Sequence, residues 1–401
     1  MKKLLLIIII FCSALHAQAP VATTDDIKNR DKFLYSVKAP KTFEESIDIQ
    51  IVNGEILVPV TIKGKTYQFL FDTGATCALS PKLKEELHLT ALTSSHLTDS
   101  AGDQSFQYFY MIKSLSLGGI TFKQVCAASI DFKNLENMLC TSLDGVIGAN
   151  LMRTCNWRID YENKKIQFST NKLIPKTDYT TTDFTENFSG SPLVTITTGG
   201  YYFETIADTG NNGNLDISEA MYFKSRMSES GHFKKSIGKG FYSFMGNKEH
   251  IAYEGIQDSL YIGTTLVFKQ HVRVSPSPMF MLGNDFFSQF GEIAFNWENK
   301  QLYLPVNTKP GEPEVIFGFT PIITEGGIEV GVVYEDSEAQ KMGFEVGDKI
   351  LSINGEDLTN VSKLQWCKLR EIFKKEKNIE VTILKPDGIK KTAQLAKYNL
   401  L

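Results

Sequence analysis

Two short segments of the chain share the triplet Asp-Thr-Gly, one at Asp72 and one at Asp208. Two carboxyl groups held side by side cannot both ionise freely, so such a pair retains one proton and titrates as a unit. The ionised member can take a proton from a water molecule while the protonated member polarises a carbonyl group. If the triplets meet in the folded chain, they predict an acid-base pair that adds water to a carbonyl without a covalent intermediate.

The other two residues of each triplet suit this chemistry as well. The glycines, Gly74 and Gly210, let neighbouring backbone approach closely. The hydroxyl groups of Thr73 and Thr209 can link one loop to the other through hydrogen bonds. We therefore expect each triplet to form a tight loop that helps to hold the two carboxyl groups together.

An internal repeat is expected to position both triplets. Alternating apolar residues around a glycine turn predict a two-stranded hairpin over residues 57–71 and again, 136 positions later, over residues 193–207. An apolar pair followed by glycine recurs downstream, at 146–148 and at 281–283. Two unrelated turns after strands would not require this second match. The pattern therefore favours two related lobes made mainly of β-strands.

The two loops and their downstream apolar-Gly segments resemble the two halves of a retropepsin-like or pepsin-like aspartic protease. The matching residues are Phe71-Asp72-Thr73-Gly74-Ala75 with Val146-Ile147-Gly148, and Ala207-Asp208-Thr209-Gly210 with Met281-Leu282-Gly283. The resemblance covers about residues 45–305 and implies a bilobal fold of β-barrel lobes, with Asp72 and Asp208 as the catalytic pair. It also implies that the apolar-Gly strands pass beneath the loops, that the substrate is a peptide or protein, and that no cofactor or metal is required.

These families close a β-hairpin flap over the substrate, and two turns are candidates for its tip. The first-lobe candidate precedes a strand-like run at 106–111 and contains Ala101 and Gly102. The second-lobe candidate contains Met245 and Gly246. Because glycine with polar neighbours is typical of any turn, a plain exposed hairpin turn stays open as the alternative for both.

The second loop departs from the family's pattern. Ala75 fits the pattern in the first loop, but Asn211-Asn212 follow Gly210 where these families usually carry Ser, Thr or Ala. Asn211 can hydrogen-bond the carboxylate through its side-chain amide. The alternative is that the second loop is no longer catalytic. Three functions stay open: an intramolecular aspartic endopeptidase, a peptide-binding protein on a protease scaffold, and a homodimeric protease that uses only Asp72.

Two further details concern the loops. Because Ala75 replaces a Ser or Thr, one hydrogen bond to the ionised pair is missing, so we expect activity at mildly acidic to neutral pH. Asp216 is close to the second loop in sequence, but its setting in Leu215-Asp216-Ile217-Ser218 predicts the end of a strand rather than a place in the site.

The C-terminal segment has a different pattern. Ser337 is expected to cap a short helix that Gly343 ends, and Asn354-Gly355 predict a hairpin turn. This segment resembles a PDZ domain. The resemblance implies that a loop of Phe317, Gly318 and Phe319 holds a peptide carboxylate, and that residues 362–373 form the helix that walls the groove. Pro321 removes one backbone donor from the strand beside that groove. We expect the domain either to bind a peptide tail or to pack against the two lobes and position them.

The N-terminus predicts export. Lys2 and Lys3 form a basic region, residues 4–15 are apolar, and Ala17-Gln18-Ala19 is a small-x-small cleavage pattern. We expect a signal peptide over residues 1–19, and a mature chain that is periplasmic or secreted in a Gram-negative-like bacterium, with no membrane span.

The net charge limits the possible partners, and the cysteines limit the possible metal sites and disulfides. The formal net charge of −4 argues against nucleic acid or an anionic membrane surface as a partner. The sequence contains no Cys-x-x-Cys and no His-Glu-x-x-His motif, so it does not predict a zinc site. The sequence permits one disulfide among Cys126, Cys140 and Cys155, or buried free thiols instead.

These patterns predict six segments along the chain. They are a signal peptide (1–19), a first lobe (20–170), an inter-lobe connection (171–192), a second lobe (193–306), a linker (307–313) and a PDZ-like domain (314–401).

Overall fold

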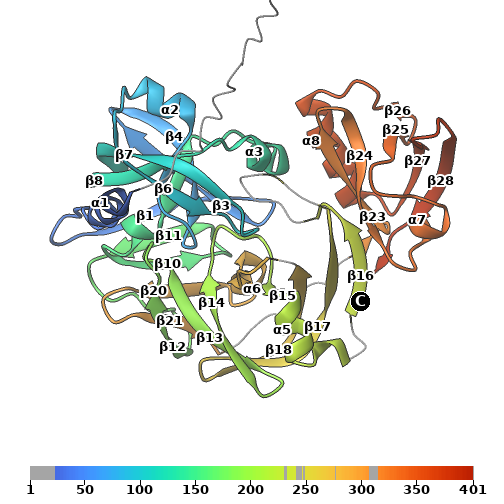
Figure 1. Cartoon of the computed structure of the whole chain (residues 1–401). Helices are drawn as coiled ribbons and strands as arrows, with labels where there is room; N and C mark the ends of the chain where they lie inside the picture. Colours follow the sequence, from blue (N-terminus) through green and yellow to red (C-terminus); the bar gives the residue numbers. More distant parts are fainter. Residues whose placement is uncertain are drawn as a thin grey trace, which may run out of the picture.

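The structure, a computed structural model, describes residues 23–229, 233–240, 246, 249–275, 277–306 and 315–400. It is mainly β: two lobes built from sheets lie against each other, and a smaller C-terminal domain lies to one side (Figure 1). The expected signal peptide and the expected linker at 307–313 lie outside the described residues. No helix in the described parts of the chain is long and apolar enough to cross a membrane.

The first lobe is a barrel-like sheet of eight strands in the order β2-β3-β4-β9-β5-β8-β7-β6, closed by a further pairing of β3 with β7. Its strands are β2 (Gln50–Val52), β3 (Glu55–Ile62), β4 (Lys65–Asp72), β5 (Ala78–Leu79), β6 (Ala91–Thr98), β7 (Gln104–Leu117), β8 (Ile120–Ser129) and β9 (Gly145–Gly148). Its helices are α1 (Thr24–Leu34), α2 (Pro81–Glu86), α3 (Lys133–Leu139) and α4 (Ala149–Met152). The hairpin predicted to end at Asp72 is formed by β3 and β4, which turn at Lys63 and Gly64 with positive φ at both residues.

The second lobe repeats this topology strand for strand. Its strands are β13 (Pro192–Thr198), β14 (Tyr201–Ala207), β15 (Leu215–Ser218), β16 (Phe233–Gly238), β17 (His250–Ile262), β18 (Thr265–Ser275) and β19 (Met281–Leu282). Its helical segments are α5 (Glu219–Lys224), η1 (Met227–Glu229) and α6 (Asn284–Ser288). Both lobes pair the Asp strand in parallel with the apolar-Gly strand, β4 with β9 and β14 with β19, and β13 closes on β17 as β3 closes on β7. The predicted internal duplication is confirmed by these matching pairings.

A layer of strands joins the two lobes in the order β1-β11-β10-β20-β21-β12. These strands are β1 (Glu44–Asp48), β10 (Asn156–Asp160), β11 (Lys165–Ser169), β12 (Tyr179–Glu186), β20 (Glu292–Asn296) and β21 (Gln301–Pro305). At its centre Arg158 pairs with Ala294, and these residues differ by the repeat distance of 136 that also separates Thr73 from Thr209. A local twofold axis therefore passes between β10 and β20. The segment 171–192, expected as a connection, contains β12 and so contributes a strand to this layer.

The C-terminal domain has its own apolar core. Its strands are β22 (Val315–Ile316), β23 (Phe319–Thr324), β24 (Gly327–Tyr334), β25 (Lys349–Ile353), β26 (Glu356–Asp357), β27 (Asn378–Leu384), β28 (Lys390–Ala396) and β29 (Tyr398–Asn399). Its helices are α7 (Glu338–Lys341) and α8 (Lys363–Lys375). Ser337 caps α7, as predicted, and Ser362 caps α8. Pro321 lies in β23 at a shift in register, where a missing donor is tolerated.

The disulfide pairing differs from the one considered from the sequence. Cys140, which follows α3, pairs with Cys367 of α8. Cys126 and Cys155 are buried free thiols, and so is Cys77. Of the two possibilities that the sequence left open, buried free thiols hold for Cys126 and Cys155, whereas Cys140 bonds to a cysteine outside the trio, 227 positions away in another domain.

Candidate active site

Each Asp-Thr-Gly loop follows a buried strand that places it at the lobe interface. Asp72 is the last residue of β4 and pairs with Gly148 in β9. Ala207, immediately before Asp208, pairs with Leu282 in β19. The apolar-Gly strands thus lie beside the loops in both lobes, as expected.

The glycine of each apolar-Gly segment lets the loop pack against that strand. A Cβ atom on Gly148 would lie 2.4 Å from the backbone nitrogen of Cys77, just beyond the first loop. A Cβ atom on Gly283 would lie 2.5 Å from the carbonyl oxygen of Asn211 in the second loop. Both distances are too short for a side chain, so glycine at these positions is required by packing of the loops.

The two threonines join the loops by reciprocal hydrogen bonds. The backbone N–H of Thr73 donates to Oγ1 of Thr209 at 3.0 Å, and that of Thr209 donates to Oγ1 of Thr73 at 2.9 Å. Each hydroxyl group then donates across the interface, from Thr73 to the carbonyl of Ala207 and from Thr209 to that of Phe71. All four groups are buried and satisfied, which holds the loops in one arrangement.

The two carboxyl groups meet at the twofold axis. A Cβ atom on Gly74 would lie 2.4 Å from Cγ of Asp208, and one on Gly210 would lie 2.2 Å from Cγ of Asp72. Each carboxyl group therefore lies over the glycine of the opposite loop, and a hydrogen bond links the two. Each also accepts from the backbone N–H of its own glycine, at 2.8 Å for Asp72 and 2.9 Å for Asp208.

The surroundings of the two carboxyl groups differ. Burial, followed by the charge of Asp72, raises the pKa of Asp208 well above its ordinary value. Burial also raises the pKa of Asp72, but the hydrogen bond with Asp208 and the backbone N–H groups of Gly74 and Ala75 oppose this effect. The arrangement favours a single shared proton, held by Asp208, with Asp72 as the ionised member.

The unusual Asn211 supports the second loop from within its own lobe. Its Nδ2 donates to Oδ2 of Asp216 at 2.7 Å, and its Oδ1 accepts from the backbone N–H of Gly213 at 2.9 Å. Asp216 is only 1% exposed and receives both Nε and Nη2 of Arg273, at 2.6 and 2.7 Å. Asn211 thus binds Asp216 instead of a carboxylate of the pair. Asp216 lies in β15, as predicted, and from there it supports the second loop through Asn211.

A third carboxyl group, Glu55, lies near the pair and was not found from the sequence. It stands at the start of β3 and is 4% exposed. Burial, then the charges of Asp208 and Asp72, raises the pKa of Glu55 well above its ordinary value, which favours its neutral form. Glu55 belongs to no motif, so only the fold brings it near the loops.

The predicted flap tip of the first lobe reaches the second lobe. Ala101 and Gly102 lie in the turn between β6 and β7, where Oδ1 of Asp99 accepts from the backbone N–H of Ala101. The hydroxyl group of Ser277 donates to the carbonyl of Ser100 in this turn, which is therefore not a plain exposed turn. In the second lobe, Met245 lies outside the described residues. Gly246 is placed near α3, where a Cβ atom would lie 3.7 Å from Nδ2 of Asn134.

The predicted carboxylate loop of the C-terminal domain is well ordered by its own contacts. Gly318 has a φ of 82°, and its carbonyl accepts from the backbone N–H of Tyr334 and from Oγ of Ser337. Phe317 and Phe319 are buried, and both pack edge-on against Phe373 of α8. Peptide binding by this loop stays a prediction. Within the described residues, no group of three or more His, Cys, Asp or Glu side chains is arranged to hold a metal ion.

Two segments of the chain match known protein families. A family model described as aspartyl protease matches residues 58–151, which include Asp72 and Gly148, and a model described as PDZ domain matches residues 329–367. An aspartic proteinase from Irpex lacteus is 14% identical over 67% of this chain and 98% of its own, with a TM-score of 0.40. A retropepsin-like aspartic protease from Rickettsia conorii is 18% identical over 34% of this chain and 96% of its own, with a TM-score of 0.24.

A search of curated proteins gave no match. The family match at 58–151 includes the first loop but not the second. The second loop contacts the first through the reciprocal hydrogen bonds of Thr73 and Thr209. Residues 58–151 therefore form an aspartyl protease domain, and residues 329–367 belong to a PDZ domain.

Proposed function

We propose that this protein is an aspartic endopeptidase whose complete catalytic pair, Asp72 and Asp208, lies within one chain. The observation that supports this most directly is the placement of each carboxyl group over the glycine of the opposite loop, with one hydrogen bond between them. A pair held in this way by buried threonine contacts is ready to share one proton before substrate binds.

The proposed reaction uses one water molecule and no covalent intermediate. Asp72 takes a proton from the water as its oxygen attacks the carbonyl carbon, and Asp208 donates its proton to the carbonyl oxygen. The resulting gem-diol then collapses: Asp72 gives its proton to the nitrogen as the carbon–nitrogen bond breaks, and Asp208 takes a proton from a hydroxyl group of the gem-diol, so that the pair again holds one proton. The β6–β7 turn covers the reaction when it meets Ser277, which limits access of bulk water.

The test is cleavage of a diverse peptide library by the mature chain between pH 3 and 8, in parallel with the variants Asp72→Asn and Asp208→Asn. We expect turnover at mildly acidic to neutral pH, and a loss of about 10²–10⁴-fold in kcat for each variant, the usual contribution of acid-base groups. Circular dichroism and unfolding curves serve as the control that both variants remain folded.

The same experiment separates the other two functions. A homodimeric protease built from first-lobe loops would keep its turnover in Asp208→Asn. A peptide-binding protein on this scaffold would show no turnover in the wild-type chain. Either result would overturn the proposed catalytic pair.

We also propose that the protein acts after export, because residues 1–19 have the pattern of a signal peptide. The PDZ domain is proposed to recruit a peptide or protein by strand addition to β23. Binding of peptide tails to the full chain, measured by fluorescence anisotropy with and without Gly318→Val, tests this role, since a side chain at Gly318 would clash with Ser337.

A further inference from the structure

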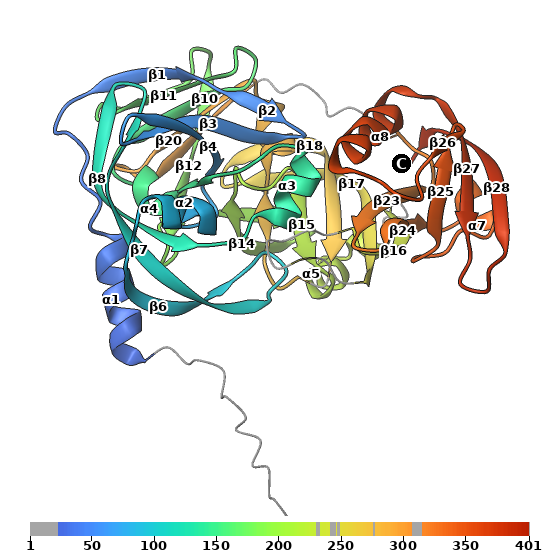
Figure 2. The same cartoon turned by 90° about the horizontal axis from the view of Figure 1, so that it is seen from above.

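The PDZ domain is attached to both lobes. One face of α8 is directed towards α3 of the first lobe, and the two helices lie side by side in both views (Figures 1 and 2). Three contacts join them: the Cys367–Cys140 disulfide, a hydrogen bond of 2.9 Å from Nε1 of Trp366 to the carbonyl of Asn137, and the Lys363–Glu136 ion pair of 3.7 Å. A covalent bond together with a buried donor makes this a fixed contact rather than a loose association.

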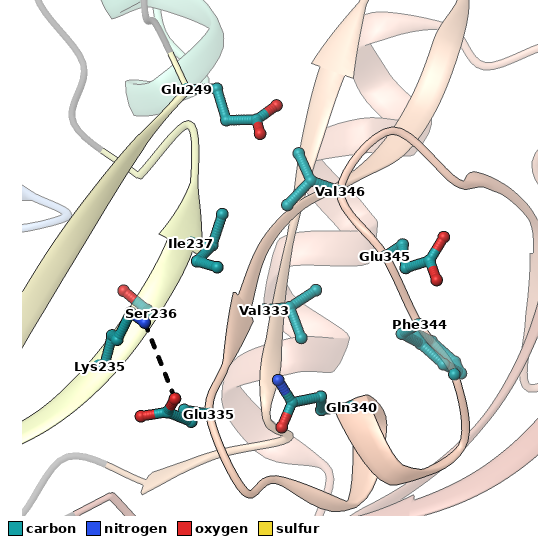
Figure 3. A pocket seen from close by; sticks show the side chains of 11 residues that line it. Lys235, Ser236, Ile237, Glu249, Val333, Glu335, Gln340, Phe344, Glu345 and Val346 are labelled. Carbon is teal, nitrogen blue, oxygen red and sulfur yellow. Dashed lines mark ion pairs between the residues drawn. The ribbon is translucent and has the colours of Figure 1, made fainter.

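The second attachment is a strand of the second lobe. In the strand order shared by the two lobes, β16 corresponds to β6, one of the strands that carry the first-lobe flap. Here β16 pairs with β24 of the PDZ domain, with Ser236 opposite Tyr334 and Gly238 opposite Val332. Figure 3 shows side chains of β16, including Ile237, facing Val333 and Val346 across a small pocket at this junction. The PDZ domain thus continues the sheet of the second lobe.

A turn of the first lobe connects the first of these attachments, that of α8 to α3, to the second loop. Asn53 and Gly54, both with positive φ, form the turn between β2 and β3. Nζ of Lys374 in α8 donates to Oδ1 of Asn53 at 2.6 Å, and Nδ2 of Asn53 donates to the carbonyl of Met138 in α3 at 3.2 Å. On its other side, the carbonyl of Asn53 accepts from Nδ2 of Asn212 at 3.2 Å.

The turn is packed as well as hydrogen-bonded against the second loop. A Cβ atom on Gly54 would lie 2.9 Å from Cβ of Asn212, so the turn and the loop are in direct contact. Asn212 is four positions after Asp208. The first loop is held differently: the carbonyl of Ala75 accepts from the backbone N–H of Ala149 in the same lobe, at 2.8 Å.

We infer that the PDZ domain positions the catalytic loop of the second lobe: α8, fixed by the Cys140–Cys367 disulfide, holds the Asn53–Gly54 turn against Asn212. Asn53 is then a positioning residue, and Asn212 is the residue through which the loop of Asp208 receives this support. The effect on turnover rests on the proposed protease function, whereas the effect on the loop does not. The turn contacts the second loop directly, so we expect the loss of this contact to affect the second loop more than the first.

The experiment compares hydrogen exchange and turnover in full-length variants. Cys140→Ser/Cys367→Ser removes the covalent contact, and Lys374→Met removes the contact of α8 with Asn53 together with an exposed ion pair to Glu371. The matched control is Lys375→Met, because Lys375 is the neighbouring exposed lysine and pairs only with Glu371 of its own helix in the described contacts.

We expect exchange of backbone amides at 208–217 to rise severalfold in the double variant and less in Lys374→Met, with no rise at 72–79. We expect kcat to fall about 3- to 10-fold with little change in KM, as for the loss of one or two hydrogen bonds. Lys375→Met should behave as the wild type.

Unchanged exchange at 208–217 in both test variants would overturn the inference, and so would an equal rise at 72–79. Because exchange does not depend on turnover, an inactive wild-type chain would contradict the proposed function and leave this test decisive. Reduction of the wild-type disulfide with dithiothreitol should reproduce the double variant, and an absence of this effect would also count against the inference.

Discussion

The burial of the carboxyl groups of Asp72 and Asp208 against each other is unfavourable for folding. The reciprocal threonine contacts and the N–H groups of the two glycines offset part of it. The raised pKa of Asp208 means that the folded chain holds a proton that the unfolded chain releases. The buried pair therefore lowers the free energy of unfolding, and the size of this decrease depends on pH.

The variant Asp208→Asn should be more stable than the wild type at pH 7. Because the folded-state pKa of Asp208 is raised above the ordinary value of 3.8, the wild type loses stability as the pH rises through and above that value. Asparagine cannot ionise, so the variant does not lose stability in this way. Its advantage over the wild type in free energy of unfolding should therefore be small near pH 4. Urea unfolding at the two pH values measures it. A variant no more stable than the wild type at pH 7 would refute this account of the pair.

At the scale of elements, the second loop depends on a contact between β15 and β18. Asp216 in β15 is buried, and Arg273 in β18 is its bidentate partner. Asn211 then takes its position from Asp216. The Asn that departs from the family's pattern is thus part of a defined hydrogen-bond network.

We expect Arg273→Leu to lower the free energy of unfolding by about 3 kcal/mol, because it leaves the carboxylate of Asp216 buried without its cationic partner. The turnover number should fall as well, through displacement of Asn211. The control is Lys165→Met, which removes an exposed ion pair with Asp48 and should cost at most about 1 kcal/mol. Equal losses of stability in the two variants, measured in urea, would contradict the assigned role of Arg273.

The local patterns of the sequence predicted the elements that carry the site, but not the contacts between them. The hairpins that end at Asp72 and Asp208 follow from alternating apolar residues and glycine turns, which act over a few positions. Arg273 lies 57 positions from Asp216, and Cys367 lies 227 positions from Cys140. No local pattern reports such pairs, since they depend on how strands far apart in sequence are brought together.

At the scale of the whole molecule, three units form one connected body. The two lobes share a strand order and a central layer in which β10 pairs with β20, and the apolar core crosses this layer through residues such as Trp157 and Phe295. The PDZ domain is joined to the first lobe by a disulfide and to the second by β16. The candidate pair lies where the lobes meet, and in this structure each half of the duplication contributes one of its two carboxyl groups.

Mixing of wild-type and variant chains tests whether one chain holds the complete catalytic pair. The specific activity of the wild-type chain is measured across a range of dilutions, and again with about a tenfold excess of Asp72→Asn chain. The account predicts that turnover per wild-type chain stays constant in both series. A fall on dilution, or suppression by the excess variant, would show that two chains share the site and would contradict the account.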